Sequence, residues 1–154
     1  MNRSTFLRAL PVFVGAFAMC GYASAGLVFE KEGVALCGYD PVAYFTQGRP
    51  VKGASQFQAT HQGAVFHFAS QAHRDAFVAT PGKYAPQYGG YCAFGMANGY
   101  KAATDPTSFT VSGGKLYLNY NRDVQKMWTA DMSGFVKKAD ANWPEASKQS
   151  KVQE

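Results

Sequence analysis

Two stretches of the chain alternate between apolar and polar residues, which is the pattern of half-buried β-strands. The first runs from Ser55 to His61, turns at Gln62-Gly63 and returns over Ala64 to Ala69. This alternation predicts a hairpin with one apolar face, whose residues are Phe57, Ala59, His61, Phe66 and Phe68, and with Val65 and His67 on the other face of the returning strand.

The second alternating stretch lies nearer the C-terminus. Phe109 to Val111 and Lys115 to Tyr120 flank Ser112-Gly113-Gly114, a sequence suited to a tight turn. The pattern predicts a second hairpin in which Leu116, Leu118 and Tyr120 face the core.

Helical signals follow both hairpins. Ser70 is a good N-cap for a helix through Ala79, and Asp40-Pro41 favours a short helix from Pro41 to Phe45. The longest helix is expected after Asn121, with apolar residues at intervals of three and four, and Pro144 is expected to end it. These apolar residues are Val124, Met127, Trp128, Met132, Phe135, Ala139 and Trp143. Gly134 disfavours an unbroken helix by about 1 kcal/mol relative to alanine.

Helices and antiparallel hairpins are mixed without a regular strand-helix alternation, so the predicted fold class is α+β. The length suits one small domain, predicted over residues 26–147 with a long C-terminal helix. Residues 148–154 are expected to form a frayed, flexible tail. No internal repeat is evident by inspection.

The first 25 residues have the features of a secretory signal peptide. Arg3 and Arg8 flank the start of a short apolar run, and Ala23-Ser24-Ala25 supplies small residues before a cleavage site at Gly26. The run is too short to span a bilayer, which asks for roughly twenty apolar residues. We therefore expect a periplasmic or secreted protein without stable membrane insertion, and Cys20 is expected to be removed with the signal.

Charge excludes one large class of partner. Without residues 1–25 the chain has 13 Lys and Arg and 10 Asp and Glu, so the net charge falls from +5 to +3. The basic residues are scattered and form no patch interleaved with aromatics, which disfavours nucleic-acid binding.

Aromatics, glycines and a thiol are concentrated between Tyr84 and Met96. Cys92 in this stretch is suited to act as a nucleophile, a redox centre or a ligand for a soft metal. The usual serine-hydrolase, zinc-protease and phosphate-loop motifs are absent from the sequence, so a non-enzymatic role is favoured and catalysis remains open.

Several motifs together resemble those of bacterial exported YHS domain-containing proteins, and they cover nearly the whole chain after the signal. They are Gly38-Tyr39-Asp40-Pro41-Val42-Ala43-Tyr44-Phe45, the spaced series Phe68, His73, Phe77, Pro81 and Tyr84, then Tyr88-Gly89-Gly90-Tyr91-Cys92-Ala93, Gly114 to Asn121, and Ala139-Asp140 with Asn142-Trp143-Pro144. The resemblance implies metal handling, because similar modules attached to heavy-metal transport ATPases bind soft metals through cysteines.

The chain departs from that metal-binding version at one position. Where those modules carry a Cys-x-x-x-Cys pair, this chain has Ala69 and His73. A metal site would have to use Cys92 and His73, with Met96, Cys37, His61 or His67 as further ligands. Thiolate, thioether and imidazole donors favour copper, above all Cu(I).

Three other interpretations remain open. Cys37 and Cys92 would be the two thiols of the exported protein, and a disulfide between them would add about 3 to 4 kcal/mol. A thiol-redox protein is an alternative in which His73 activates Cys92. The third is a small-ligand or interaction module, with Tyr39, Asp40, Tyr88 and Tyr91 lining a pocket.

Overall fold

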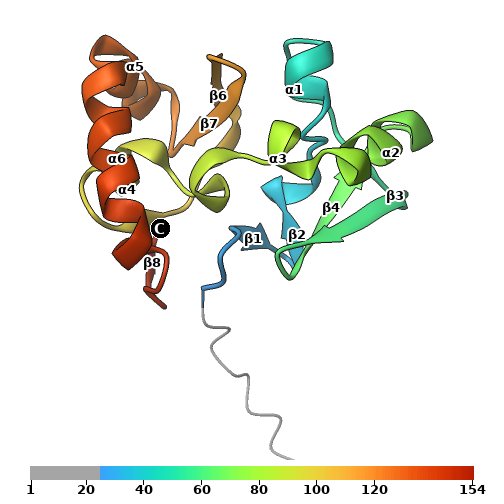
Figure 1. The fold of residues 1–154 in the computed structure, drawn as a ribbon, viewed down its shortest axis with the longest axis horizontal. Coiled ribbons are helices and arrows are strands. Elements are labelled where there is room, and N and C mark those ends of the chain that lie inside the picture. Colours follow the sequence, from blue (N-terminus) through green and yellow to red (C-terminus); the bar gives the residue numbers. More distant parts are fainter. Residues whose placement is uncertain (1–24) are drawn as a thin grey trace, which may run out of the picture.

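The computed structural model describes residues 25–154, and residues 1–24 of the predicted signal segment, with Cys20, lie outside the described residues. Figure 1 shows two groups of helices and short strands lying side by side, which confirms the α+β class. The group nearer the N-terminus contains β1 (Glu30–Lys31), β2 (Val34–Ala35), η1 (Leu36–Gly38), α1 (Ala43–Thr46), β3 (Ala54–His61), β4 (Ala64–Phe68), α2 (Gln71–Ala79) and α3 (Pro81–Tyr84). The other contains η2 (Gln87–Gly90), α4 (Ala93–Ala97), β5 (Lys101–Ala102), β6 (Asp105–Ser112), β7 (Lys115–Asn119), α5 (Arg122–Ala130), α6 (Met132–Ala146) and β8 (Val152–Gln153).

Both predicted hairpins are confirmed. β3 pairs antiparallel with β4, and Phe66 and Phe68 are fully buried on its inner face. β6 pairs antiparallel with β7 in the same way. Ser70 caps α2 as expected, its side chain accepting a hydrogen bond from the backbone N–H of His73. Local pattern and cap chemistry therefore determine these elements.

The two groups repeat one structural unit. β3, β4 and α2 match β6, β7 and α5 in length, and each residue has its counterpart 51 positions later, as for Ala54 and Asp105. The break in strand pairing falls at the same place in both hairpins. The helix caps also correspond, Ser70 with Asn121.

The turns before these hairpins correspond as well. Leu36, Cys37 and Gly38 all have positive φ, and so do Tyr88, Gly89 and Gly90, which lie 52 positions later. A positive φ costs conformational free energy in residues other than glycine, so three successive residues with positive φ are unusual. We call residues 36–84 the first unit and residues 88–135 the second unit.

Few side chains are shared by the two units, which explains why the repeat is not evident in the sequence. The glycines at several equivalent turns are retained, as in Gly48 and Gly99 or Gly63 and Gly114. The core residues differ in size, for example Phe77 in α2 and Trp128 in α5, which are both buried. The two units therefore share their backbone geometry and differ in the side chains that pack their cores.

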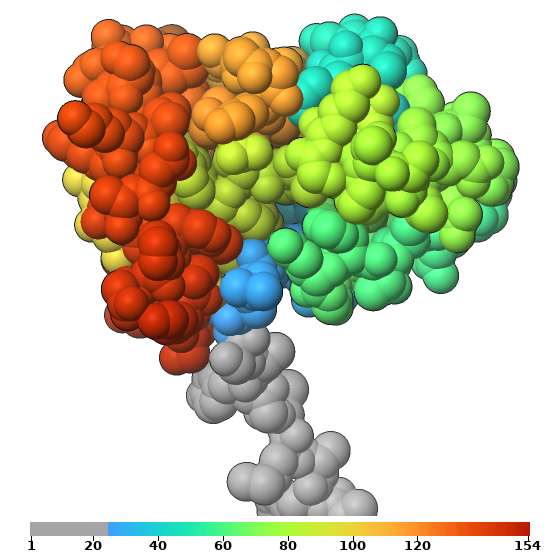
Figure 2. Space-filling view, in the orientation of Figure 1, coloured from blue at the N-terminus to red at the C-terminus, as the bar shows by residue number. Residues whose placement is uncertain are grey.

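Each unit has its own hydrophobic core, and β7 joins them. Leu116 and Leu118 belong to the core of the first unit, whereas Tyr117 belongs to the core of the second. Tyr44 also donates a hydrogen bond to the carbonyl of Pro106 across the units, at 2.8 Å. Figure 2 shows the two lobes in contact, with the segment after residue 25 at their junction.

Burial of β7 on both faces corrects one prediction. Strict alternation placed Tyr120 in the core with Leu116 and Leu118, but Tyr120 is 44% exposed. Tyr117 and Asn119 are buried instead, because the opposite face of the strand is covered by the second core.

The prediction of one continuous helix after Asn121 was also wrong, because the helix is interrupted at Asp131. This residue has φ −140° and ψ 59°, and its carboxylate accepts a hydrogen bond from the N–H of Gly134 at 3.2 Å. A side chain at position 134 would collide with that carboxylate. Pro144 lies within the last turn of α6 and does not end it.

The C-terminal residues differ from the frayed tail expected. β8 pairs in parallel with β5, and the carbonyl of Gln149 accepts a hydrogen bond from the ammonium of Lys101 at 2.9 Å. Among residues 25–154, no helix has the length and apolar character needed to cross a membrane.

We predict that Gly53→Ala destabilises the fold and that Gly82→Ala does not. A Cβ at position 53 would lie 2.5 Å from the backbone carbon of His67, so β4 would have to move, at a cost of about 1–3 kcal/mol. A Cβ at position 82, in α3, would have no neighbouring atom within 4 Å, and alanine there should raise the free energy of unfolding by up to about 1 kcal/mol. Urea unfolding of both variants measures the difference, and equal midpoints would contradict the prediction.

Candidate functional site

Asp40 and His73 form a buried pair in the first unit. The Asp40 side chain is fully buried, and its Oδ2 lies 2.6 Å from Nδ1 of His73. The carboxylate also accepts hydrogen bonds from three backbone N–H groups, those of Val42 at 2.8 Å, Ala43 at 3.3 Å and Ala69 at 2.9 Å. These bonds join the start of α1, the end of β4 and α2.

His73 is therefore oriented through one ring nitrogen. Its side chain is 19% exposed, and Nε2 is the nitrogen not engaged by Asp40. A carboxylate behind an imidazole is an arrangement found at metal sites and in acid-base catalysis. The sequence singled out both residues but did not reveal that they form a pair.

Cys92 occupies a different environment in the second unit. Its side chain is buried, and Sγ lies 3.7 Å from Oδ1 of Asn119 and 3.5 Å from the backbone N of Gly95. Burial raises the pKa of the thiol, and the backbone N–H groups of Gly95, Tyr120 and Phe94 oppose that shift. A raised pKa is opposite to what an activated redox thiol needs.

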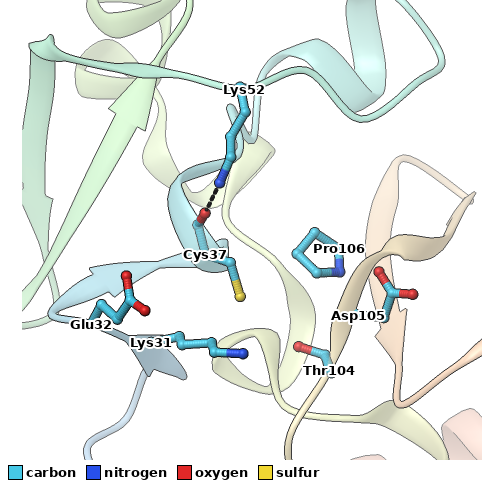
Figure 3. A pocket seen from close by; sticks show the side chains of 7 residues that line it. All are labelled: Lys31, Glu32, Cys37, Lys52, Thr104, Asp105 and Pro106. Atoms are coloured by element: carbon cyan, nitrogen blue, oxygen red, sulfur yellow. Dashed lines mark hydrogen bonds between the residues drawn. The ribbon is translucent and has the colours of Figure 1, made fainter.

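Cys37 faces an open cleft between the two units (Figure 3). The cleft has a volume of about 440 Å³ and combines charged side chains from both units. Its lining residues are Lys31, Glu32, Cys37, Lys52, Thr104, Asp105 and Pro106. A second hollow of about 220 Å³ shares Cys37 and adds His67.

The backbone around Cys37 holds the thiol in this position. Cys37 has φ 51°, and its carbonyl accepts a hydrogen bond from Nζ of Lys52 at 2.6 Å. Burial raises the pKa of the half-buried thiol, while the ammonium groups of Lys31 and Lys52 act in the opposite direction. The thiol is thus accessible and lies beside two cations.

The predicted disulfide between Cys37 and Cys92 is not formed, and both thiols are free. Cys37 lies in the turn of the first unit, where its counterpart in the second unit is Gly89. Cys92 lies three residues further on in the second unit and points to Asn119. The two thiols therefore serve different local structures.

Met96 and the tyrosines make internal contacts. Met96 is fully buried in the second core. The hydroxyl of Tyr88 donates to Asp140 and that of Tyr91 to the carbonyl of Gly26, each at 2.8 Å. Burial raises the pKa of Tyr91 to about 12. The ammonium of Lys52 lies over the ring of Tyr39, and its Nζ is 4.6 Å from the ring centre.

The structure does not bring His73 and Cys92 into one described contact. His73 lies on α2 and pairs with Asp40, whereas Cys92 precedes α4 and pairs with Asn119, and Figure 1 shows α2 and α4 on opposite sides. Among residues 25–154, no group of three or more His, Cys, Asp or Glu side chains could hold a metal ion. His61 packs against Phe77 at a centroid distance of 5.6 Å.

Sequence reasoning named Cys37 but missed the residues around it. Lys31 and Glu32 lie a few residues before Cys37, but Lys52 and Asp105 are distant in the chain, and only the packing of the two units adds Asp105. No local motif signals such a cleft.

We predict that Asp40→Ala lowers the free energy of unfolding by about 3–5 kcal/mol, because three N–H groups and His73 lose a buried acceptor. Asp75→Ala is the matched control: its side chain is 58% exposed, and its loss should cost no more than about 0.5 kcal/mol. Chemical unfolding followed by circular dichroism compares them. Similar losses for both variants would contradict the structural role of Asp40.

The segment of the chain that matches a known protein family lies almost entirely in the first unit. A family model described as the YHS domain matches residues 42–88, from the start of α1 to the first residue of the second unit. No curated protein and no solved structure matches the chain. The YHS domain is associated with metal binding. Residues 42–88 are therefore similar to the YHS domain, which agrees with the resemblance that the sequence motifs indicated, and most of the matched segment lies in the first unit.

Proposed function

We propose that the protein is an exported carrier of a soft metal ion, with Cu(I) as its cargo and Cys37 as the anchoring ligand. The observation that carries this proposal is the free thiol of Cys37 in an open cleft of about 440 Å³. The association of YHS domains with metal binding supplies the class of cargo.

The surroundings of the other candidate ligands favour Cys37 over them. Cys92 is 2% exposed, and its sulfur already accepts a hydrogen bond from the backbone N–H of Gly95, so a metal ion has little access to it. Met96 is sealed in the second core. His73 has one nitrogen engaged with Asp40, so it offers only Nε2.

The donor types around Cys37 support copper as the cargo. A thiolate and an imidazole suit Cu(I), and His67 lines the hollow that adjoins Cys37. The carboxylates of Glu32 and Asp105 line the cleft and attract a cation. A structural zinc site typically needs four closely placed ligands, a set that the described residues do not provide.

Cu(I) binding is expected to depend on Cys37 and not on Cys92. Wild-type protein should retain about one Cu(I) per chain, and Cys37→Ser should weaken binding by more than about 100-fold, because even loss of an outer-shell partner costs about 10–100-fold. An anaerobic titration against a chromophoric Cu(I) chelator measures affinity, and mass spectrometry of desalted protein measures the bound metal.

Cys92→Ser is the matched control, since it removes the other free thiol by the same substitution. It should leave Cu(I) binding within a few-fold of wild type. Loss of copper in Cys92→Ser with retention in Cys37→Ser would reject Cys37 as the anchor. Absence of copper from the wild-type protein would reject the proposed cargo.

The second candidate function is small-molecule binding in the same cleft. The ammonium groups of Lys31 and Lys52 give it affinity for an anionic ligand. This function predicts binding that survives Cys37→Ser and is lost when Lys31 and Lys52 are replaced. A thiol-redox function by disulfide exchange is less well supported, because neither thiol has a partner thiol.

Export is part of the proposal and rests on the sequence of the first 25 residues. An oxidising compartment would leave the thiols of Cys37 and Cys92 exposed to oxidants. Cell fractionation with N-terminal sequencing tests both the compartment and cleavage before Gly26.

A further inference from the structure

Cys92 stands in the second unit where Asp40 stands in the first. The residues are 52 positions apart, each after a Gly-Tyr pair that follows the left-handed turn. The backbone N–H of Asp40 donates to the carbonyl of Val51 at 2.8 Å, and that of Cys92 donates to the carbonyl of Ala102 at 3.0 Å. The two side chains therefore leave equivalent points of the backbone.

Equivalent backbone donors surround the two side chains. The carboxylate of Asp40 accepts from the N–H groups of Val42, Ala43 and Ala69. Their counterparts 51 or 52 positions later are the N–H groups of Phe94, Gly95 and Tyr120, which lie around the sulfur of Cys92. The N–H of Gly95 donates to that sulfur at 3.5 Å. In the first unit these donors come from two separate segments and bind a carboxylate. The second unit has the same arrangement of donors around a thiol.

The site around Cys92 contains a further donor that has no acceptor. Asn119 is fully buried, and its Oδ1 faces Sγ of Cys92 while it accepts a hydrogen bond from the N–H of Phe94 at 3.2 Å. Its Nδ2 has no hydrogen-bond partner. A buried donor left unpaired costs about 1–3 kcal/mol, so an oxygen atom added beside it would be favourable.

A small oxidant can approach this thiol. Cys92 lines a hollow of about 200 Å³, together with Phe94, Gly95, Tyr100, Tyr120 and residues of the C-terminal strand. Tyr120 is 44% exposed at the hollow. The space suits a molecule of the size of hydrogen peroxide.

We propose that Cys92 is an oxidation site, and that its sulfinate is held by the second unit as the carboxylate of Asp40 is held by the first. A sulfinate carries two oxygens and one negative charge, as a carboxylate does. The backbone N–H groups of Gly95 and Tyr120 and Nδ2 of Asn119 would donate to those oxygens, while the N–H of Phe94 keeps its bond to Oδ1 of Asn119. This inference does not depend on metal binding at Cys37.

The chemistry needs hydrogen peroxide or another peroxide as the oxidant. In the first step the sulfur attacks one peroxide oxygen, an S–O bond forms and the O–O bond breaks. The thiol proton passes to the departing hydroxide, so that water is released and the sulfenic acid remains on Cys92. A second peroxide oxidises the sulfenic acid to the sulfinate, with release of water and a proton. In each step sulfur loses two electrons and the peroxide gains them.

The experiment treats the Cys37→Ser protein with hydrogen peroxide, so that no disulfide can form, and identifies the products by peptide mass spectrometry. Cys92 should gain two oxygen atoms and stop there, and the oxidised protein should unfold at a higher denaturant concentration than the reduced protein. The wild-type protein supplies Cys37 as an internal reference thiol. An unmodified Cys92 under conditions that fully oxidise Cys37, or an oxidised protein that unfolds more readily, would overturn the proposal.

A second comparison tests the anion site without oxidation. Cys92→Asp places a carboxylate there, and Cys92→Asn is its neutral isostere. At pH 7 the Asp variant should have the higher unfolding midpoint, and this advantage should disappear as acid protonates the carboxylate. An Asn variant that is equally stable at pH 7 would show that the site does not favour an anion.

Discussion

The fold depends on an anchored turn placed before the first helix of each unit. Three successive residues with positive φ bring the chain back on itself, and the buried side chain that follows binds N–H groups from two segments. In the first unit this side chain is Asp40, whose carboxylate connects the turn, β4 and α2. Because a buried charge without partners costs several kcal/mol, the surrounding N–H groups and His73 must be in place together.

The same constraint explains which parts of the fold could be predicted from the sequence. The hairpins follow from strict alternation around Gln62-Gly63 and Gly113-Gly114, and α2 follows from the cap at Ser70, because these signals are local. The break at Asp131 was missed, since its cap competes with apolar spacing that continues across it. The inward prediction for Tyr120 failed because β7 ends at Asn119, so Tyr120 lies beyond the strand and is exposed.

The candidate site was less predictable because its geometry is not local. Cys37, Cys92 and His73 could be chosen as reactive residue types, but their partners come from other segments of the chain. Asp40 and His73 are 33 positions apart, and the cleft at Cys37 depends on Asp105 from the second unit. The repeat itself was hidden, because glycines at left-handed positions are a weak sequence signal while Phe77 and Trp128 fill equivalent core positions with different shapes.

The divergence of the two units separates two kinds of thiol chemistry. At Cys37 the thiol is half-buried in an open cleft that is lined by carboxylates and ammonium groups, and His67 lines the adjoining hollow. At Cys92 the counterparts of the donors that hold a carboxylate in the first unit surround the sulfur. Val124 stands at the position of His73, whose ring contacts that carboxylate in the first unit. The second unit therefore has most of an anion site around a neutral thiol, and Asn119, whose Oδ1 faces the sulfur, has an unpaired Nδ2. Negative charge on that sulfur would complete the hydrogen bonding that its counterpart already has.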